Sequence, residues 1–375
     1  MMNRYARPAL ISLALLASGC ADAIVGDGPA DAGLSDFESA WKTVHDVYPY
    51  LQFKKINWDS IHAAYLPRAR SAQGDEIFPV LFDLLRELKD GHTQLIPRGG
   101  LPTVNVYMMP RYERDKNAYD PLVVRRYFST ELRLAGNQHI EYEILPGNVA
   151  YVHFSVFAEG SWVDEFSAVL DYVRLTKGMI LDLRLNPGGD GETGDKVVAR
   201  FIAAPLPQAP VYALGQLLHW GPILPAGPYT YTQPVVVLIN GTSASMAEAV
   251  AEMMTQRPGV ILAGDTTAGM GGSQTIFDLP SGRKIRISTK DLRRYDDQPI
   301  EWNGVPPDTC ILQTEADVKG GRDRQLEYAL QALLGNPPLS ERPAGVPGTS
   351  RCFPWRRNCT SSPTRGPSPS RSSMR

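Results

Sequence analysis

The chain has 375 residues, of which 43% are hydrophobic and 21% are charged, so it is long enough to bury at least one substantial core. Its 38 basic and 40 acidic side chains give a formal net charge of -2. This balance, together with the lack of a long basic stripe, excludes the electrostatic footprint of a nucleic-acid-binding protein.

Residues 1–23 are typical of an export signal. Arg4 and Arg7 precede an apolar run over residues 9–17, which is too short to span a bilayer. The sequence LASGC ends at Cys20 and looks like a bacterial lipoprotein cleavage box, whereas the Ala-Asp-Ala that follows could serve an ordinary signal peptidase. We therefore expect a protein of the bacterial cell envelope, anchored by a lipid on Cys20 or otherwise secreted.

Residues 30–98 are predicted to form a small module of three helices. Apolar residues recur at helical spacing over 36–48, in the segment after Asn57, and over 75–90. Pro79 falls in the first turn of the third helix, where it is tolerated. This helix leads into the turn Asp90-Gly91, with His92 directly after it.

Residues 99–147 read as a short β-rich connection, with strand-like alternation over 121–129 and 139–145. The segment is too short for an inserted peptide-binding module of PDZ type. We therefore expect no PDZ domain.

Residues 148–335 alternate between strand-like and helix-like segments, over 148–157, 161–177, 178–186, 192–204, 234–240 and 245–256. Strands that are apolar along their whole length and alternate with helices indicate an α/β layered domain with parallel strands. Further strand-like stretches turn around residues 280–282, and a helix that ends at Gly335 closes the domain.

Residues 336–375 are rich in Pro, Ser and Arg and poor in apolar residues, so we expect a disordered tail. Apart from Cys20, the cysteines are Cys310, Cys352 and Cys359, and none has the CxxC spacing of a metal site. Export would permit a disulfide between Cys352 and Cys359.

Two loops follow parallel strands and should therefore face one cleft. The first is NPGGD, residues 186–190, where the amides of Gly188 and Gly189 could form an oxyanion hole or belong only to a tight turn. The second holds Ser243 and Ser245 at the start of a helix, where a serine could be a nucleophile or merely an N-cap.

Together these segments resemble the C-terminal processing (tail-specific) serine peptidase family, which includes the tricorn core peptidases. The order and spacing of six segments match over roughly residues 35–335, namely KDGHT (89–93), LDLRLNPGGD (181–190), VLINGTSASMAE (237–248), GDTTAGMGG (264–272), LPSGRKIRIST (279–289) and EWNGVPPD (301–308).

The resemblance assigns roles to particular residues. The family's nucleophile lies three residues before a glutamate, and Glu248 places it at Ser245. Met270 stands where the Ser/Lys branch has its basic lysine, and a thioether is no useful base. The tricorn-like branch instead implies His92 as the general base and Glu301 as the carboxylate that orients it.

The resemblance also implies a ClpP/crotonase-like catalytic domain that cleaves polypeptides, with the amides of Met246 and of Gly188 or Gly189 binding the oxyanion. No metal or organic cofactor is required. His153 is expected to lie in the core. Two alternatives remain open, an inactive ligand-binding relative of the retinoid-binding type and a crotonase-type acyl-CoA enzyme.

Overall fold

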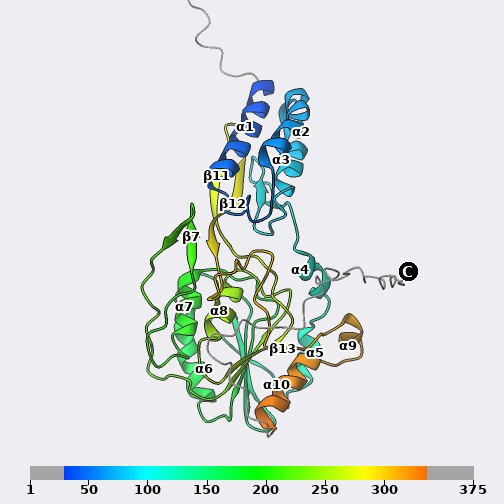
Figure 1. Cartoon of the computed structure of the whole chain (residues 1–375). Coiled ribbons are helices and arrows are strands. Elements are labelled where there is room, and N and C mark those ends of the chain that lie inside the picture. Colours follow the sequence, from blue (N-terminus) through cyan, green and yellow to red (C-terminus); the bar gives the residue numbers. More distant parts are fainter. Residues whose placement is uncertain (1–28, 336–375) are drawn as a thin grey trace, which may run out of the picture.

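The computed structural model describes residues 29–335. The expected export signal, the lipidation site at Cys20, the Cys352–Cys359 disulfide and the C-terminal tail lie outside these residues. Helices α1–α3 gather at one end of the molecule and a larger α/β domain forms the other (Figure 1). Within the described part of the chain, no helix is both long and apolar enough to cross a membrane.

The helical module comprises α1 (Pro29–Val47), α2 (Trp58–Ser71), a 3₁₀ turn η1 (Gly74–Glu76) and α3 (Ile77–Arg86). The side chain of Asn57 caps α2 by accepting a hydrogen bond from the amide of Ser60 at 3.0 Å. Pro79 lies in the first turn of α3, as predicted. The apolar faces of these helices form a core of their own, as their sequence periodicity predicts.

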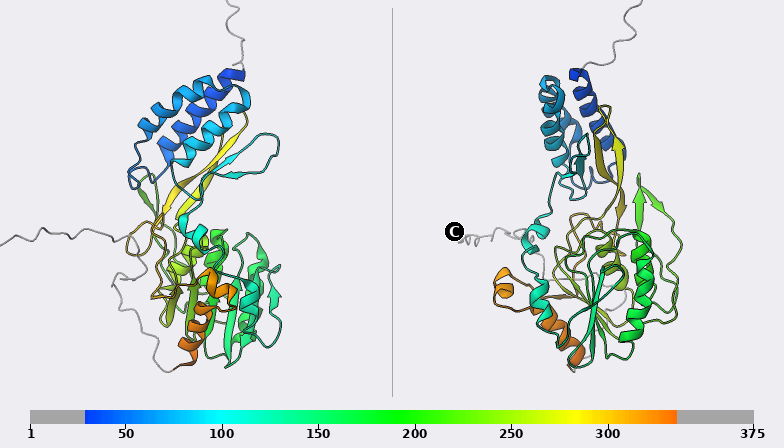
Figure 2. Two further views of the ribbon diagram at one scale, coloured as in Figure 1. Left: turned by 90° about the vertical axis from the view of Figure 1, so that its right-hand side faces the viewer. Right: turned by 180° about the vertical axis from the view of Figure 1, so that it is seen from behind.

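A hairpin from far along the chain completes this module. Strands β11 (Gly272–Asp278) and β12 (Lys284–Leu292) extend from the α/β domain to the helices (Figure 2). Ile285 and Ile287 are fully buried in the helical core. At the hairpin's tip, buried Asp36 of α1 accepts a hydrogen bond from the Ser281 amide at 2.8 Å and pairs with Arg283. The helical module therefore depends on residues that follow most of the α/β domain.

The hairpin belongs to an antiparallel sheet with the order β2-β1-β12-β7-β8, in which β11 pairs with β12. Its other strands are short, and they are β1 (Gln94–Ile96), β2 (Val104–Asn105), β7 (Val211–Ala213) and β8 (Gln216–Leu218). Strand β1 pairs antiparallel with β12, so the segment that leads out of α3 is fixed to the hairpin just after His92.

The α/β domain is built on a seven-stranded sheet with the order β13-β10-β9-β6-β5-β4-β3. The strands β5, β6, β9, β10 and β13 pair in parallel, and β3 and β4 are antiparallel additions at one edge. Their bounds are β3 (Arg133–Ala135), β4 (Ile140–Leu145), β5 (Val149–Phe154), β6 (Met179–Asp182), β9 (Val235–Ile239), β10 (Val260–Gly264) and β13 (Thr309–Cys310).

Helices cover both faces of this sheet (Figures 1 and 2). One face packs against α6 (Phe166–Val173), preceded by the 3₁₀ turn η2 (Ser161–Glu165), and against α7 (Gly191–Val198) and α8 (Met246–Met254). The other face packs against α10 (Arg324–Leu334), which follows the short α9 (Glu315–Lys319). Two-sided burial explains why β5, β6 and β9 are apolar along their whole length, and it confirms the predicted α/β layers.

The connection between the two parts differs from the prediction. Residues 121–129, expected as a strand, begin with helix α5 (Pro121–Arg125), and α4 (Pro110–Asp115) lies before it. Asp120 caps α5 through the Leu122 amide at 2.8 Å, and Pro121 occupies the first helical position, so a capping signal outweighed the β-branched valines. The second expected strand is β4. Because β4 pairs with β5, the boundary predicted at residue 148 falls inside one sheet.

Candidate active site

The loops that follow β6 and β9 meet at the carboxyl edge of the sheet, as predicted. We call residues 186–190 the glycine turn and residues 240–245 the serine turn. The Ala244 amide donates to the carbonyl oxygen of Asn186 at 3.0 Å, and the Leu185 amide donates to Oγ1 of Thr242 at 2.8 Å. These bonds fix the two turns to each other.

Ser245 has a strained backbone. Its φ of 56° and ψ of -121° lie outside the regions that side-chain-bearing residues normally adopt, at a cost of about 1–3 kcal/mol. Its amide donates to Oε2 of Glu248 at 2.9 Å, so the first turn of α8 holds it in this conformation. The turn leaves the side chain of Ser245 partly exposed at the start of α8, as in the strand-to-helix turns that carry nucleophilic serines.

Ser243 is in a different situation. Its side chain is fully buried, its hydroxyl donates to the carbonyl oxygen of Leu183 at 2.8 Å, and its oxygen accepts from the Asn240 amide at 3.2 Å. The hydroxyl therefore joins the serine turn to the end of β6 and is not accessible to a substrate. The burial of Ser243 and the spacing from Ser245 to Glu248 both favour Ser245 over Ser243 as the candidate nucleophile.

Gly188 lies directly against Ser245. With φ at 94°, it has a conformation that favours glycine, and a Cβ placed on it would lie 2.6 Å from both Ser245 Cβ and the Met246 nitrogen. Its own amide already donates to Oδ1 of Asn186 at 2.8 Å. Of the two glycine amides expected as oxyanion donors, that of Gly188 is therefore occupied within the turn.

Gly189 forms an isolated parallel bridge with Phe157. The bonds of this bridge run from the Phe157 amide to the Gly188 carbonyl at 2.8 Å and from the Asp190 amide to the Phe157 carbonyl at 2.6 Å. In a parallel bridge of this kind the amide of the central residue points to the opposite side. The Gly189 amide therefore faces away from Phe157 and takes no part in the bridge.

Glu248 does more than mark the motif. Its fully buried carboxylate accepts four hydrogen bonds, from Thr267 Oγ1 (2.5 Å) and from the amides of Gly269 (2.8 Å), Met270 (2.8 Å) and Ser245 (2.9 Å). These contacts fasten residues 267–270 to the start of α8. Glu248 thus positions both Ser245 and the loop that carries Met270.

His92 is 8% exposed and follows the turn at the end of α3. Its amide donates to Oδ1 of Asp90 at 2.7 Å, whereas its Nδ1 is buried and has no hydrogen-bond partner among the described residues. Burial lowers the pKa of His92; Asp90 opposes this shift, and the positive charges of Arg286 and Lys54 reinforce it. The imidazole is therefore neutral near pH 7, as a general base must be.

Met270 connects the surroundings of His92 with those of Ser245. A Cβ on Gly91 would lie 3.0 Å from Sδ and from Cε of Met270, so this thioether packs against the backbone next to His92. The Met270 amide donates to Glu248, which also binds the Ser245 amide. The loop that carries Met270 therefore contacts the backbone next to His92 with its side chain and, through Glu248, the start of α8 with its amide.

Glu301 is fully buried, but its contacts differ from the expected contact with His92. Its Oε1 accepts from Nζ of Lys54 at 2.6 Å and its Oε2 accepts from the Gly271 amide at 3.2 Å. A buried carboxylate requires compensation by charge or hydrogen bonds, and here Lys54 supplies the charge. Glu301 therefore contacts Lys54 and the Gly271 amide in place of the predicted contact with His92, and no sequence motif pointed to Lys54.

His153 lies in the core, as predicted. It is 5% exposed, and its Nε2 lies 3.0 Å from the carbonyl oxygen of Arg184. Its other ring nitrogen faces Glu141 at 3.3 Å. His153 therefore has structural partners on both sides of its ring.

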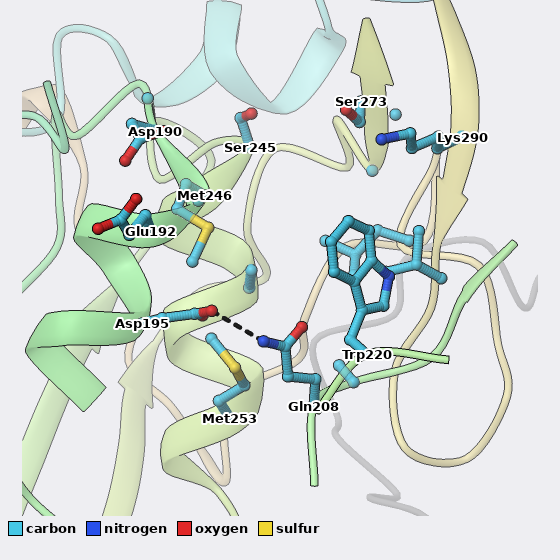
Figure 3. Close-up of a pocket in the computed structure, with 18 of the residues that line it drawn as sticks. Asp190, Glu192, Asp195, Gln208, Trp220, Ser245, Met246, Met253, Ser273 and Lys290 are labelled. Carbon is cyan, nitrogen blue, oxygen red and sulfur yellow. Dashed lines mark hydrogen bonds between the residues drawn. The ribbon is translucent and has the colours of Figure 1, made fainter. Parts of the chain in front are cut away.

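A cavity of about 620 Å³ opens beside Ser245 (Figure 3). Met246 and Met253 of α8 line it together with Asp195 of α7, and Trp220 and Lys290 line it from across the opening. Burial, aided by nearby acidic groups, raises the pKa of Asp195 to about 6. The cavity thus combines apolar walls with the carboxylates of Asp190, Glu192 and Asp195, of which Asp195 accepts a hydrogen bond from Gln208 at 2.9 Å.

Among residues 29–335, no group of three or more His, Cys, Asp and Glu side chains is arranged to hold a metal ion. The polar groups next to Ser245 are backbone amides and the buried carboxylate of Glu248. Such groups suit acyl transfer to a serine, in which donors aimed at a carbonyl oxygen and a nearby base carry the chemistry.

Comparison with known proteins points to the same chemistry. The model of peptidase family S41 matches residues 148–311, and that of the tricorn protease C1 domain matches residues 30–88. A carboxyl-terminal-processing protease of Synechocystis is 26% identical over 208 residues, which cover 54% of this chain and 48% of that protein. The carboxy-terminal processing protease CtpA of Bacillus subtilis is 29% identical over 169 residues, 44% of this chain and 35% of that protein.

Among solved structures, a putative peptidase from Parabacteroides merdae superposes with a TM-score of 0.70 at 26% identity, covering 80% of this chain and 96% of that one. The chain spans about half the length, or less, of the curated relatives that it matches. The matched segments include the glycine turn, the serine turn and Glu301. Residues 148–311 of this chain therefore carry the sequence pattern of peptidase family S41.

Proposed function

We propose that this protein is a serine peptidase that hydrolyses peptide bonds in polypeptides, with Ser245 as its nucleophile. The observation that carries the proposal is the strained backbone of Ser245 at the start of α8, in contact with Gly188. A conformation this costly persists only where the surroundings enforce it, and strain of this kind is concentrated at functional sites. Ser245 is one of the residues that line the cavity.

In the first step, Oγ of Ser245 attacks the carbonyl carbon of the substrate while Nε2 of His92 takes the hydroxyl proton. The carbonyl oxygen becomes an oxyanion, which accepts hydrogen bonds from the amides of Gly189 and Met246. We assign these two donors because the Gly188 amide already binds Asn186. Met246 is the first residue of α8, whose dipole favours negative charge at this end.

The tetrahedral adduct then collapses. The carbon–nitrogen bond breaks, His92 returns its proton to the departing amine, and the acyl group remains bonded to Ser245. A water molecule gives a proton to His92 and attacks this ester, which releases the new carboxylate and restores the Ser245 hydroxyl. Every step uses groups of the chain itself and water.

The names of the relatives indicate a substrate class. Both curated proteins are carboxyl-terminal processing proteases, and we propose that this chain also removes segments near the carboxyl ends of polypeptides. The cavity beside Ser245 is large enough for a substrate side chain, which would contact Met246 and Met253.

The site of action belongs to the same proposal. An amino-terminal sequence with the pattern of an export signal supports a location in the bacterial cell envelope, and the LASGC sequence supports a lipid on Cys20. Metabolic labelling with radioactive palmitate tests the anchor. We expect the wild type to be labelled and the Cys20→Ser variant to remain unlabelled. If neither protein were labelled, the proposed lipid on Cys20 would be refuted.

The test of the proposed activity compares two single substitutions at serines that lie two residues apart. Hydrolysis of an unfolded polypeptide, with the released amino groups measured, should disappear in Ser245→Ala and persist in Ser243→Ala. The Ser243 hydroxyl serves as the matched control because it is buried in contact with Leu183. Equal loss in both variants, or hydrolysis by both, would refute Ser245 as the nucleophile.

A further inference from the structure

A buried lysine joins the helical module to the candidate active site. The Lys54 side chain has no exposed surface, and its Nζ lies 2.6 Å from Oε1 of Glu301, whose side chain is equally buried. Moving an ammonium group out of water is unfavourable, and only good contacts can offset this cost. The two residues are 247 positions apart, so this pair fixes distant parts of the chain to each other.

The remaining contacts of Lys54 hold the end of α3. Its ammonium donates to the carbonyl oxygens of Leu88 at 2.9 Å and Lys89 at 3.3 Å, and to the hydroxyl of Tyr48 at 2.9 Å. The two carbonyls belong to the segment 88–93, which contains the Asp90-Gly91-His92 sequence and which we call the histidine turn. Lys54 therefore holds the start of the turn that presents His92.

Trp302 reinforces this arrangement from the α/β domain. Its indole nitrogen donates to the Lys89 carbonyl at 2.9 Å, and its ring centroid lies 4.9 Å from Nζ of Lys54. A cation this close to an aromatic face is attracted to it. The residues Glu301 and Trp302 thus hold both Lys54 and the turn that it binds.

On the opposite side, the same carboxylate reaches the loop beside Ser245. Glu301 accepts from the Gly271 amide at 3.2 Å, and the preceding amides of Gly269 and Met270 bind Glu248. Glu248 in turn binds the Ser245 amide. Lys54 and Ser245 are therefore the two ends of a chain of buried contacts that runs through Glu301, residues 269–271 and Glu248.

From these contacts we infer that Lys54 is a positioning residue, which holds the histidine turn and the 269–271 loop in the relative placement that catalysis by His92 and Ser245 requires. The inference rests on the proposed peptidase function. It accounts for the absence of a direct contact between Glu301 and His92, since Glu301 acts on the turn through Lys54. It also makes docking of the helical module a condition for activity.

The test compares Lys54→Met, which keeps the length of the side chain and removes its charge, with Lys55→Met at the exposed neighbouring position. In Lys54→Met we expect hydrogen–deuterium exchange of residues 88–93 to accelerate while exchange of β5 is unchanged. Because small misplacements of catalytic groups cost about 100-fold in rate, kcat/KM should fall by about that factor. Lys55→Met should behave as the wild type in both measurements.

The pH profile gives a readout that a merely structural role would not change. The charged groups that act on His92 are Asp90, Arg286 and Lys54, and the charge of Lys54 opposes protonation of the imidazole. Without that charge the acid limb of kcat/KM should move to higher pH. An acid limb identical to that of the wild type would overturn this part of the inference.

A double variant protects the test against simple misfolding. Lys54→Met combined with Glu301→Gln removes both the buried ammonium and the carboxyl group that faces it, so we expect its thermal midpoint to recover relative to Lys54→Met while its activity does not. If activity returned together with stability, the pair would be only structural and the inference would be wrong. Unchanged exchange of residues 88–93 in Lys54→Met would also overturn it. The exchange measurement needs no turnover, so it stands even if the wild type proves to have no peptidase activity.

Discussion

Gly188 packs so closely against Ser245 that a single added carbon would lie 2.6 Å from Cβ of Ser245. The same carbon would lie 2.7 Å from the carbonyl oxygen of Ala244. Backbone atoms and a Cβ cannot rotate away from such a contact as the end of a flexible side chain can. The glycine turn and the serine turn are thus fitted to each other at the point where we place the nucleophile.

Gly188→Ala should therefore displace Ser245. The substitution adds the clash and also places alanine at a φ of 94°, which favours glycine. We predict a fall in kcat/KM of about 100-fold or more, comparable to the loss of an oxyanion donor. The matched control is Gly221→Ala, where an added Cβ would meet nothing within 4 Å. If Gly188→Ala retained the activity of the control, the close fit of the two turns would not matter for catalysis.

Ser243→Ala should affect stability more than chemistry. The substitution removes the donor to the Leu183 carbonyl and the acceptor of the Asn240 amide, both buried. Leaving a buried polar group without a partner costs about 1–3 kcal/mol. We expect the free energy of unfolding in urea to fall by this amount while Ser245 still reacts with a fluorophosphonate probe. Unchanged stability would show that these bonds contribute little.

The pH dependence of hydrolysis should reflect the buried histidine. His92 acts as a base only when neutral, and burial lowers its pKa below the ordinary value of 6.5. The fall of kcat/KM in acid should therefore occur below pH 6.5. Above that value His92 is already neutral, and its titration should no longer change kcat/KM. The same shift predicts that stability is lost as pH falls below 6.5, because the unfolded chain binds the proton more readily. An acid limb above pH 6.5 would contradict this assignment.

Asp195 should influence the choice of substrate. Its pKa of about 6 means that the carboxyl is charged above pH 6 and neutral below it. The quantity to measure is the kcat/KM of a peptide whose cationic side chain enters the cavity, divided by that of a matched neutral peptide. We predict that this ratio increases as pH rises through 6. Comparing the two peptides at each pH cancels the titration of His92. Asp195→Asn should remove the pH dependence of this ratio. A ratio that still rose in the variant would exclude Asp195 as the cause of the preference for cationic peptides.

Local sequence was sufficient to predict most of the fold. Buried parallel strands are continuous apolar runs, so residues 148–157 and 234–240 could be recognised as β5 and β9 without any knowledge of their neighbours. The apolar stripe of α3 was equally clear. The strand predicted over residues 121–129 was wrong because the alternation of apolar and polar residues favoured a strand, whereas Asp120 and Pro121 form a helix cap.

What the sequence did not reveal depends on contacts between distant residues. Nothing near Lys54 in sequence indicates Glu301 as its partner, and nothing near Ile285 indicates burial among the helices of the amino-terminal module. Likewise, the choice between Gly188 and Gly189 as amide donors required the bond from Gly188 to Asn186. Motif spacing predicted the candidate residues of the site, and the structure shows which groups contact them.

The central claim is that Ser245 attacks with the help of His92, and the most direct measurement is a crystal structure of the protein after reaction with a fluorophosphonate. We predict a covalent bond from phosphorus to Oγ of Ser245, a phosphoryl oxygen within hydrogen-bonding distance of the Gly189 and Met246 amides, and Nε2 of His92 within about 3.2 Å of Oγ. A phosphorus adduct on another residue, or His92 held beyond reach of Ser245 in the adduct, would contradict the account.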